Sequence, residues 1–125
     1  MKLELTPDTL AVCQLKPNDP IPAWAMQGKF FSISKTEDEL SIVCEQSSLP
    51  AGVKCEPDWR AFKVQGPLDF SLTGILASLA TPLAAAAISI FAISTFDTDY
   101  VLIKAVSLSR AMEVLQSNGH TIETP

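Results

Sequence analysis

The sequence predicts an α+β fold made of two copies of one βαββαβ unit. Short runs with strand-type alternation recur along the chain and are bounded by proline, glycine and aspartate. A shift of sixty residues superposes Phe31 on Phe91 and Ile33 on Ile93, as a tandem repeat would. The unit that fits this order is a split βαβ, which forms a four-stranded antiparallel sheet with helices on one face.

The first half of the chain is expected to hold strands and one short helical turn. Alternation indicates strands over residues 1–5, 10–15, 30–34 and 40–45. Prolines between residues 16 and 22 exclude regular structure there and predict a loop. Residues 22–27 predict a helical turn that begins at Pro22 and ends before Gly28. We expect Trp24 in this turn to pack in the core or at an interface.

The second half is expected to hold two helices among its strands. Leu76, Leu79 and Leu83 recur at helical spacing, but Pro82 cannot donate to the carbonyl of Ser78, which predicts a kink. We expect strands over residues 59–64, 88–95, 100–106 and 120–123, one helix over residues 73–86, and a second that Ser107 or Ser109 caps and that ends at Ser117.

The repeat divides the chain into a first module, residues 1–60, and a second module, residues 61–125. Under the sixty-residue shift the hairpin of residues 34–43 overlays that of residues 94–103, so that Glu39 meets Asp99. The first module has prolines and a tryptophan where the second has its alanine run. We therefore expect the first module to have degenerate helices.

Residues 70–96 contain no charged side chain and are long enough to suggest a membrane span. Pro82 lies in the middle of this run, and residues 88–96 are rich in β-branched and aromatic residues that favour strands. Asp69, Asp97 and Asp99 flank it, where a span would have lysine or arginine on one side. The pattern favours a buried helix and a central strand over a span.

The composition excludes several classes of function. A net charge of -5 and scattered basic residues argue against a nucleic-acid surface. The N-terminus lacks a basic segment followed by an apolar one, so we expect a cytoplasmic protein with no membrane partner. No nucleophile–base pair, metal spacing or nucleotide fingerprint is present, so we expect neither catalysis nor a cofactor.

The three cysteines and the single histidine give no sign of a site. Cys13, Cys44 and Cys55 lack the close spacing of zinc or redox motifs, which favours buried apolar residues in a reducing compartment over reactive thiols. His120 follows a probable helix end at Asn118-Gly119. We expect it to be a strand-edge residue and not a general base.

Several segments resemble known proteins. FFSIS at residues 30–34, Trp59-Arg60 and IFAISTFDTDYVLIK at residues 90–104 are similar to small bacterial ACT-domain proteins and to the ACT modules of the CASTOR-type cytosolic arginine sensors. The most specific part is Pro82-Leu83 with the hairpin STFDTDY, and the resemblance covers nearly the whole chain. It implies two tandem ferredoxin-like ACT modules that regulate allosterically by binding a small effector, usually an amino acid.

The resemblance also implies a site. In ACT domains the effector lies at an interface between two modules, held by the loop and helix start after the first strand. The sensors have four modules in one chain and this chain has two, so we expect a homodimer. The implied ligand-binding residues are Asp69, Phe70, Ser71, Leu72, Thr73, Gly74 and Ile75 in the loop, with Thr95, Phe96 and Asp99 in the hairpin.

Elementary chemistry gives these residues either a binding or a structural role. Backbone N–H groups at the helix start would hold a carboxylate, and Asp69 or Asp99 would take an ammonium group or a cationic side chain. Equally, Asp69 and Thr73 would cap the helix, and Gly74 would serve close packing. The functional alternatives are thus an amino-acid-binding regulatory module and a dimerisation or docking module without a ligand.

Overall fold

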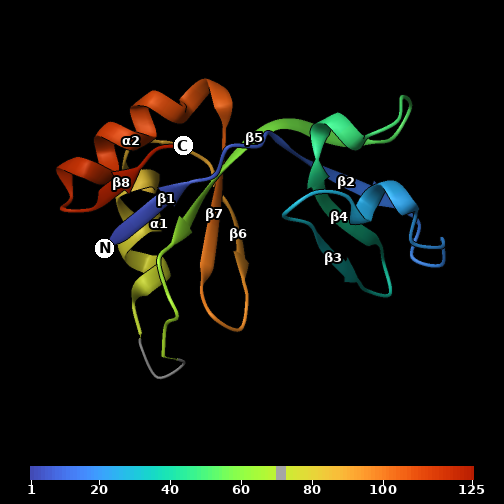
Figure 1. Cartoon of the computed structure of the whole chain (residues 1–125), viewed down its shortest axis with the longest axis horizontal. Helices are drawn as coiled ribbons and strands as arrows, with labels where there is room; N and C mark the ends of the chain where they lie inside the picture. The colour runs from blue at the N-terminus through green and yellow to red at the C-terminus, as the bar shows by residue number, and fades with distance from the viewer. Residues whose placement is uncertain (70–72) are drawn as a thin grey trace. The chain divides into compact units, whose positions relative to one another are not determined.

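The computed structural model describes residues 1–69 and 73–125, which fold into two compact units (Figure 1). One unit comprises Met1–Pro7 and Arg60–Pro125, and the other comprises Asp8–Trp59. The described residues form eight strands and two α-helices, so the predicted α+β class is confirmed. The boundary between the two units falls between Trp59 and Arg60, close to the predicted boundary between the modules. The first seven residues, however, belong to the unit that contains the second half of the chain.

The unit of Asp8–Trp59 has the strand order of a split βαβ. It contains β2 (Leu10–Leu15), β3 (Ser32–Lys35), β4 (Leu40–Glu45) and the first half of β5 (Cys55–Val64), in the antiparallel order β3-β4-β2-β5. Short 3-10 turns stand where helices would be, η1 (Ala23–Met26) and η2 (Gln46–Ser48). The prediction that this unit has degenerate helices is therefore confirmed. The prolines before Ala23 prevent a longer helix, so that only one turn forms. The buried core is Ala11, Cys13, Ala25, Leu40, Ile42 and Cys44, with Trp24 packed against it.

β5 begins four residues earlier than the sequence predicts. The pairing of β2 with β5 shifts register between Leu10 and Val12, and Asp58 has a φ of 66°. Gln46 holds this bulge, since its Oε1 accepts from the Asp58 N–H at 2.6 Å and its Nε2 donates to Asp58 Oδ1 at 2.9 Å. Pro57 and the bulge break the alternation that a sequence pattern requires.

The other unit contains the two helices. Its strands are β1 (Lys2–Leu5), the second half of β5, β6 (Phe91–Ser94), β7 (Asp99–Lys104) and β8 (Thr121–Glu123). β7 pairs with both β6 and β5. β1 pairs antiparallel with β5 and parallel with β8, so it lies between the two strands that a simple split βαβ would join.

Both helices of this unit pack on one face of its sheet (Figure 1). α1 (Ile75–Ala85) and α2 (Leu108–Ser117) replace the predicted helices with small changes at their ends, and Ser107 is the N-cap residue of α2 without a side-chain cap bond. Leucines at helical spacing bury against alternate residues of β1, β5 and β7. The core comprises Leu3, Leu5, Phe62, Val64, Leu79, Leu83, Ile88, Val101, Ile103, Ala111 and Leu115.

Most of the uncharged run forms α1 and β6. Among the described strands β6 pairs only with β7, so the predicted central strand is an edge strand. Among the residues that the structure describes, no helix is long and apolar enough to cross a membrane.

The two units repeat with a spacing of 59 residues, one fewer than the sequence predicts. β3 begins at residue 32 and β6 at 91, β4 at 40 and β7 at 99, and η2 at 46 and η3 (Ala105–Ser107) at 105. The same spacing relates Gly28, with a φ of 83°, to Ala87, with a φ of 59°. Glu39 therefore corresponds to Thr98, and Leu40 to Asp99; the sixty-residue alignment was wrong by one position.

His120 compensates for the proline within α1. Pro82 has no N–H to donate to the carbonyl of Ser78, and His120 Nε2 donates to that oxygen at 3.1 Å. Nδ1 of the same ring lies 3.2 Å from the amino group of Met1, which can only donate when it is charged. His120 is 7% exposed, so it is a buried linker and not a strand-edge residue.

We predict that His120→Ala lowers the free energy of unfolding by about 1–3 kcal/mol, because it leaves the Ser78 carbonyl without its donor. In a Pro82→Ala background the residue at 82 regains an N–H for that carbonyl, and the cost of His120→Ala should fall. Urea unfolding of the four proteins measures both costs. An equal cost in the two backgrounds would show that His120 matters only for packing.

Candidate functional site

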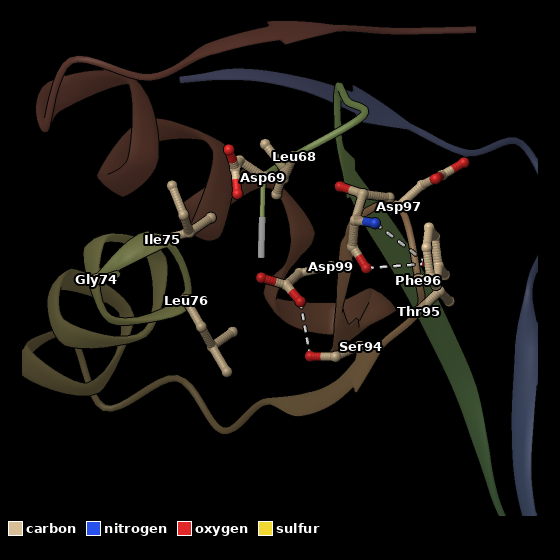
Figure 2. Close-up of a pocket in the computed structure, with 11 residues that line it drawn as sticks. Leu68, Asp69, Gly74, Ile75, Leu76, Ser94, Thr95, Phe96, Asp97 and Asp99 are labelled. Atoms are coloured by element: carbon tan, nitrogen blue, oxygen red, sulfur yellow. Dashed lines mark hydrogen bonds between the residues drawn. The ribbon is translucent and has the colours of Figure 1, made fainter. Parts of the chain in front are cut away.

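A cavity of about 290 Å³ lies in the unit that contains the helices (Figure 2). Three segments line it: Leu68 and Asp69 after β5, residues 74–76 at the start of α1, and residues 94–99 at the turn between β6 and β7. Its volume is at the lower limit of small-molecule sites, which are about 300–1,000 Å³. It therefore suits a ligand of the size of an amino acid.

The β6–β7 turn is held rigidly from two sides. Thr95 N–H donates to the Thr98 carbonyl at 2.8 Å, and Thr95 Oγ1 accepts from the Thr98 N–H at 3.3 Å. Thr98 is 4% exposed, and its Oγ1 donates to the carbonyl of Val64 in β5 at 2.6 Å. A buried hydroxyl that makes this bond fixes the turn against β5.

The loop after β5 is bonded to the same turn. Leu68 N–H donates to the carbonyl of Asp97 at 2.7 Å. A Cβ at Gly66 would lie 3.0 Å from that carbonyl oxygen, so any other residue would push the two segments apart by a few tenths of an ångström. The loop and the turn thus form one wall of the cavity.

Acidic side chains dominate the charge of the cavity. Asp69, Asp97 and Asp99 line it, and among the described lining residues there is no lysine, arginine or histidine. The half-buried Asp99 accepts a 2.6 Å hydrogen bond at Oδ1 from Ser94 Oγ. In Figure 2 the Asp99 carboxylate points into the space between the start of α1 and the turn. Ser94 fixes one oxygen of this carboxylate and so limits the orientation of the other.

The start of α1 presents backbone donors to the same cavity. Gly74 is the N-cap residue, with a φ of 75°, and has no side chain to cap the helix. The Ser78 N–H donates to the Gly74 carbonyl at 2.9 Å, which closes the first turn of the helix. N–H groups in the first turn have no partner within a helix, and they carry the positive end of its dipole. A ligand would therefore meet partial positive charge here and negative charge at Asp99.

The backbone decides one of the structural alternatives for Gly74. A Cβ at this position would meet no atom of the described residues within 4 Å, so close packing against them is not the reason for glycine. Its positive φ is the reason, because side chains strain the left-handed conformation.

Six of the ten predicted ligand-binding residues line this one cavity: Asp69, Gly74, Ile75, Thr95, Phe96 and Asp99. Thr73 is exposed and does not line it, and Phe70, Ser71 and Leu72 lie outside the described residues. Sequence reasoning missed Leu68, Leu76 and Ser94, and it recognised Asp97 and Thr98 as part of the acidic turn without including them among the ligand-binding residues. The signal for Ser94 was available, since it flanks the four-residue turn directly opposite Asp99.

Comparison with protein families identifies two matching segments. The ACT domain family profile matches residues 54–117, about half of the chain. A second profile, which describes an N-terminal domain, matches residues 8–52. The boundary between the two matches lies close to the boundary between the two compact units.

Comparison with characterised proteins finds arginine sensors. Over 95 residues the chain is 38% identical to the human protein named cytosolic arginine sensor for mTORC1 subunit 1, and equally to the bovine protein. The alignment covers 70% of this chain and 29% of each sensor, so the chain spans less than a third of these relatives.

Among solved structures, a protein from Agrobacterium tumefaciens is 40% identical, with a TM-score of 0.94, over 99% of this chain and 92% of that protein. The ligand-free regulatory subunit of aspartate kinase from Thermus thermophilus has a TM-score of 0.66 at 14% identity, over 94% of this chain and 97% of that subunit. The second likeness shows that the fold is shared.

We predict that Thr98→Val lowers the free energy of unfolding by about 1–3 kcal/mol, because the buried Val64 carbonyl loses its donor. Thr98→Ser, which keeps the hydroxyl and removes one methyl group, should cost less. Chemical unfolding of both variants makes the comparison. If valine is tolerated as well as serine, the hydrogen bond does not hold the turn.

Proposed function

Because the chain belongs to the ACT domain family, we propose that it is a non-catalytic regulatory protein that binds one amino acid in the cavity between α1 and the β6–β7 turn. The observation that carries the proposal is the arrangement of opposite charges across this cavity. The start of α1 supplies N–H donors on one side, and Asp99 supplies an oriented carboxylate on the other. A zwitterion is the simplest ligand that satisfies both.

The backbone of α1 would receive the α-carboxylate. The residues at the helix start that line the cavity are Gly74, Ile75 and Leu76, whose N–H groups would donate to an anion. The apolar side chains of Ile75 and Leu76 would exclude water from this contact, which strengthens it. Leu68 on the opposite wall adds to the apolar surface.

The acidic wall favours an amino acid with a cationic side chain. A carboxylate accepts charge-assisted hydrogen bonds from guanidinium or ammonium groups, each contributing about 1.5–3 kcal/mol. Asp69 and Asp97 add to the negative potential near Asp99. Because the curated relatives are named arginine sensors, arginine is the first candidate.

The repeat supports one acidic site per chain. At the equivalent turn of the other unit, Lys35 replaces Ser94 and the buried Leu40 replaces Asp99. The turn itself is kept, because Thr36 N–H bonds to the Glu39 carbonyl at 2.9 Å as Thr95 does to Thr98. The unit of Asp8–Trp59 therefore lacks the oriented carboxylate.

We further propose that the chain acts in the cytosol as a homodimer. The alignment covers only 29% of the sensor relatives, and the resemblance implies that such sensors carry four modules in one chain, so a second copy would supply the equivalent modules here. Phe96 lines the cavity and yet is 79% exposed, so a second copy placed beside the turn would cover it and close the site.

We predict that arginine at one hundred times its Kd raises the free energy of unfolding by about 2.7 kcal/mol. Asp99→Asn should weaken arginine binding by roughly 10- to 100-fold, equivalent to the loss of about 1.4–2.8 kcal/mol, because the amide cannot form a charged pair. Thermal-shift titrations with the twenty amino acids and isothermal titration calorimetry measure both effects.

Asp38→Asn is the matched control. Asp38 occupies the equivalent turn of the other unit and does not line the cavity, so its variant should bind arginine as the unchanged protein does. Stabilisation by neutral amino acids alone would contradict the proposal that the ligand is cationic, but it would still support an amino-acid site in this cavity. Stabilisation by none of the twenty would favour a docking or dimerisation module without a ligand.

A further inference from the structure

Three cysteines that are far apart in the sequence lie on three adjacent strands of the unit Asp8–Trp59. Cys44 is in β4, Cys13 is in β2 and Cys55 begins β5, and these strands are neighbours in the order β4-β2-β5. Cys13 and Cys44 belong to the buried core of this unit, and Cys55 packs against it. All three thiols therefore point to the same face of the sheet.

The strand register distinguishes the two neighbours of Cys13. Cys13 is directly opposite Cys55 in the antiparallel pairing. The next residues form a hydrogen-bonded pair, since Gln14 N–H donates to the Lys54 carbonyl at 3.1 Å. Bonded and non-bonded pairs alternate, so Cys13 and Cys55 form a non-bonded pair, whose Cα atoms are about 4.5 Å apart. Disulfides span Cα distances of about 4.4–6.8 Å.

Cys44 is less well placed for a bond to Cys13. It is opposite Ala11, whereas Cys13 is opposite Ile42, so the two cysteines are diagonal neighbours. Diagonal Cα atoms are about 7–8 Å apart, so the Cys13 and Cys44 thiols can share a hydrogen bond, whereas an unstrained disulfide between them would require the strands to move. The geometry allows the Cys13–Cys55 bond and disfavours the Cys13–Cys44 bond.

Exposure determines which thiol reacts first. Cys13 is 2% exposed and Cys44 is fully buried, whereas Cys55 is half-buried. A hydrogen bond with Cys44, together with burial, raises the pKa of Cys13, so its thiol stays protonated at neutral pH. An oxidant from solvent therefore meets Cys55 first.

We propose that Cys55 and Cys13 are a redox-sensitive pair that peroxide converts to an intramolecular disulfide joining β2 to β5. The Cys55 sulfur attacks the peroxide oxygen, the O–O bond breaks, and a sulfenic acid and one water form. As the Cys13 thiol transfers its proton to the sulfenic oxygen, its sulfur attacks the Cys55 sulfur, the S–O bond breaks, and a second water leaves. The two thiols lose two electrons and hydrogen peroxide gains them.

This modification site is separate from the proposed ligand cavity, since no residue of the cavity lies in the unit Asp8–Trp59. The bond would connect the first and last strands of that unit and so restrict its unfolded state. The oxidised protein should melt at a higher temperature than the reduced protein.

The test is mass spectrometry of the full chain after treatment with hydrogen peroxide. We expect a mass lower by two hydrogen atoms and, after digestion with trypsin, a linked pair of peptides that contain Cys13 and Cys55. Lys35 and Lys54 separate the three cysteines onto different peptides, so the linkage is unambiguous. Cys55→Ser should abolish the bond, and Cys44→Ala should preserve it.

Two results would overturn the proposal. One is oxidation of Cys55 to the sulfinic acid while Cys13 stays a free thiol in the unchanged protein. The other is the same mixture of disulfides from folded protein and from protein oxidised in urea, which would show that the fold does not select the pair. Circular dichroism of each variant confirms that it is folded before oxidation.

Discussion

The hydrogen bond from the buried Thr98 hydroxyl to the Val64 carbonyl is the contact on which the candidate site depends. It joins the β6–β7 turn to the end of β5, and β5 leads directly into the loop that reaches α1. The Leu68 N–H then bonds to Asp97 in the same turn. Two of the three segments that line the cavity, the turn and the loop after β5, are therefore joined to each other, and a bond shielded from water holds the turn on β5.

The two units show how one turn can be kept while its chemistry changes. Thr36 and Thr95 close their turns with the same backbone and side-chain bonds. The residues that flank the turns differ, since Ser94 and Asp99 in one unit correspond to Lys35 and Leu40 in the other. The backbone of the turn thus determines the position of the two residues that flank it. The identity of those residues determines whether a carboxylate is placed beside the turn.

The same repeat explains the different helices. In the unit that contains the two helices, the alanine-rich stretch forms α1. Its internal proline is tolerated because His120 satisfies the Ser78 carbonyl. In the unit of Asp8–Trp59, prolines precede a single 3-10 turn at the equivalent place. Gly28 and Ala87 both take a positive φ after these helical segments, so the backbone path is shared even where a glycine is not.

The loop and hairpin of the candidate site could be predicted because both are local features. A glycine before an apolar helix and a polar turn between two strands are visible within a few residues of sequence. Ser94 and Leu68 were missed, since their roles come from pairing and from the approach of a loop, which local patterns do not encode. The repeat was found one residue out of register, because short apolar patterns fit two adjacent offsets almost equally well.

The sequence by itself determined the kinds and order of the elements and the acidic turn, since periodicity and turn chemistry act over short distances. Only the tertiary structure decided that β1 lies between β5 and β8, that His120 reaches Ser78, and that Cys13 faces Cys55. These contacts join residues that are far apart along the chain. They depend on strand register, and a shift of one residue would turn each side chain to the opposite face.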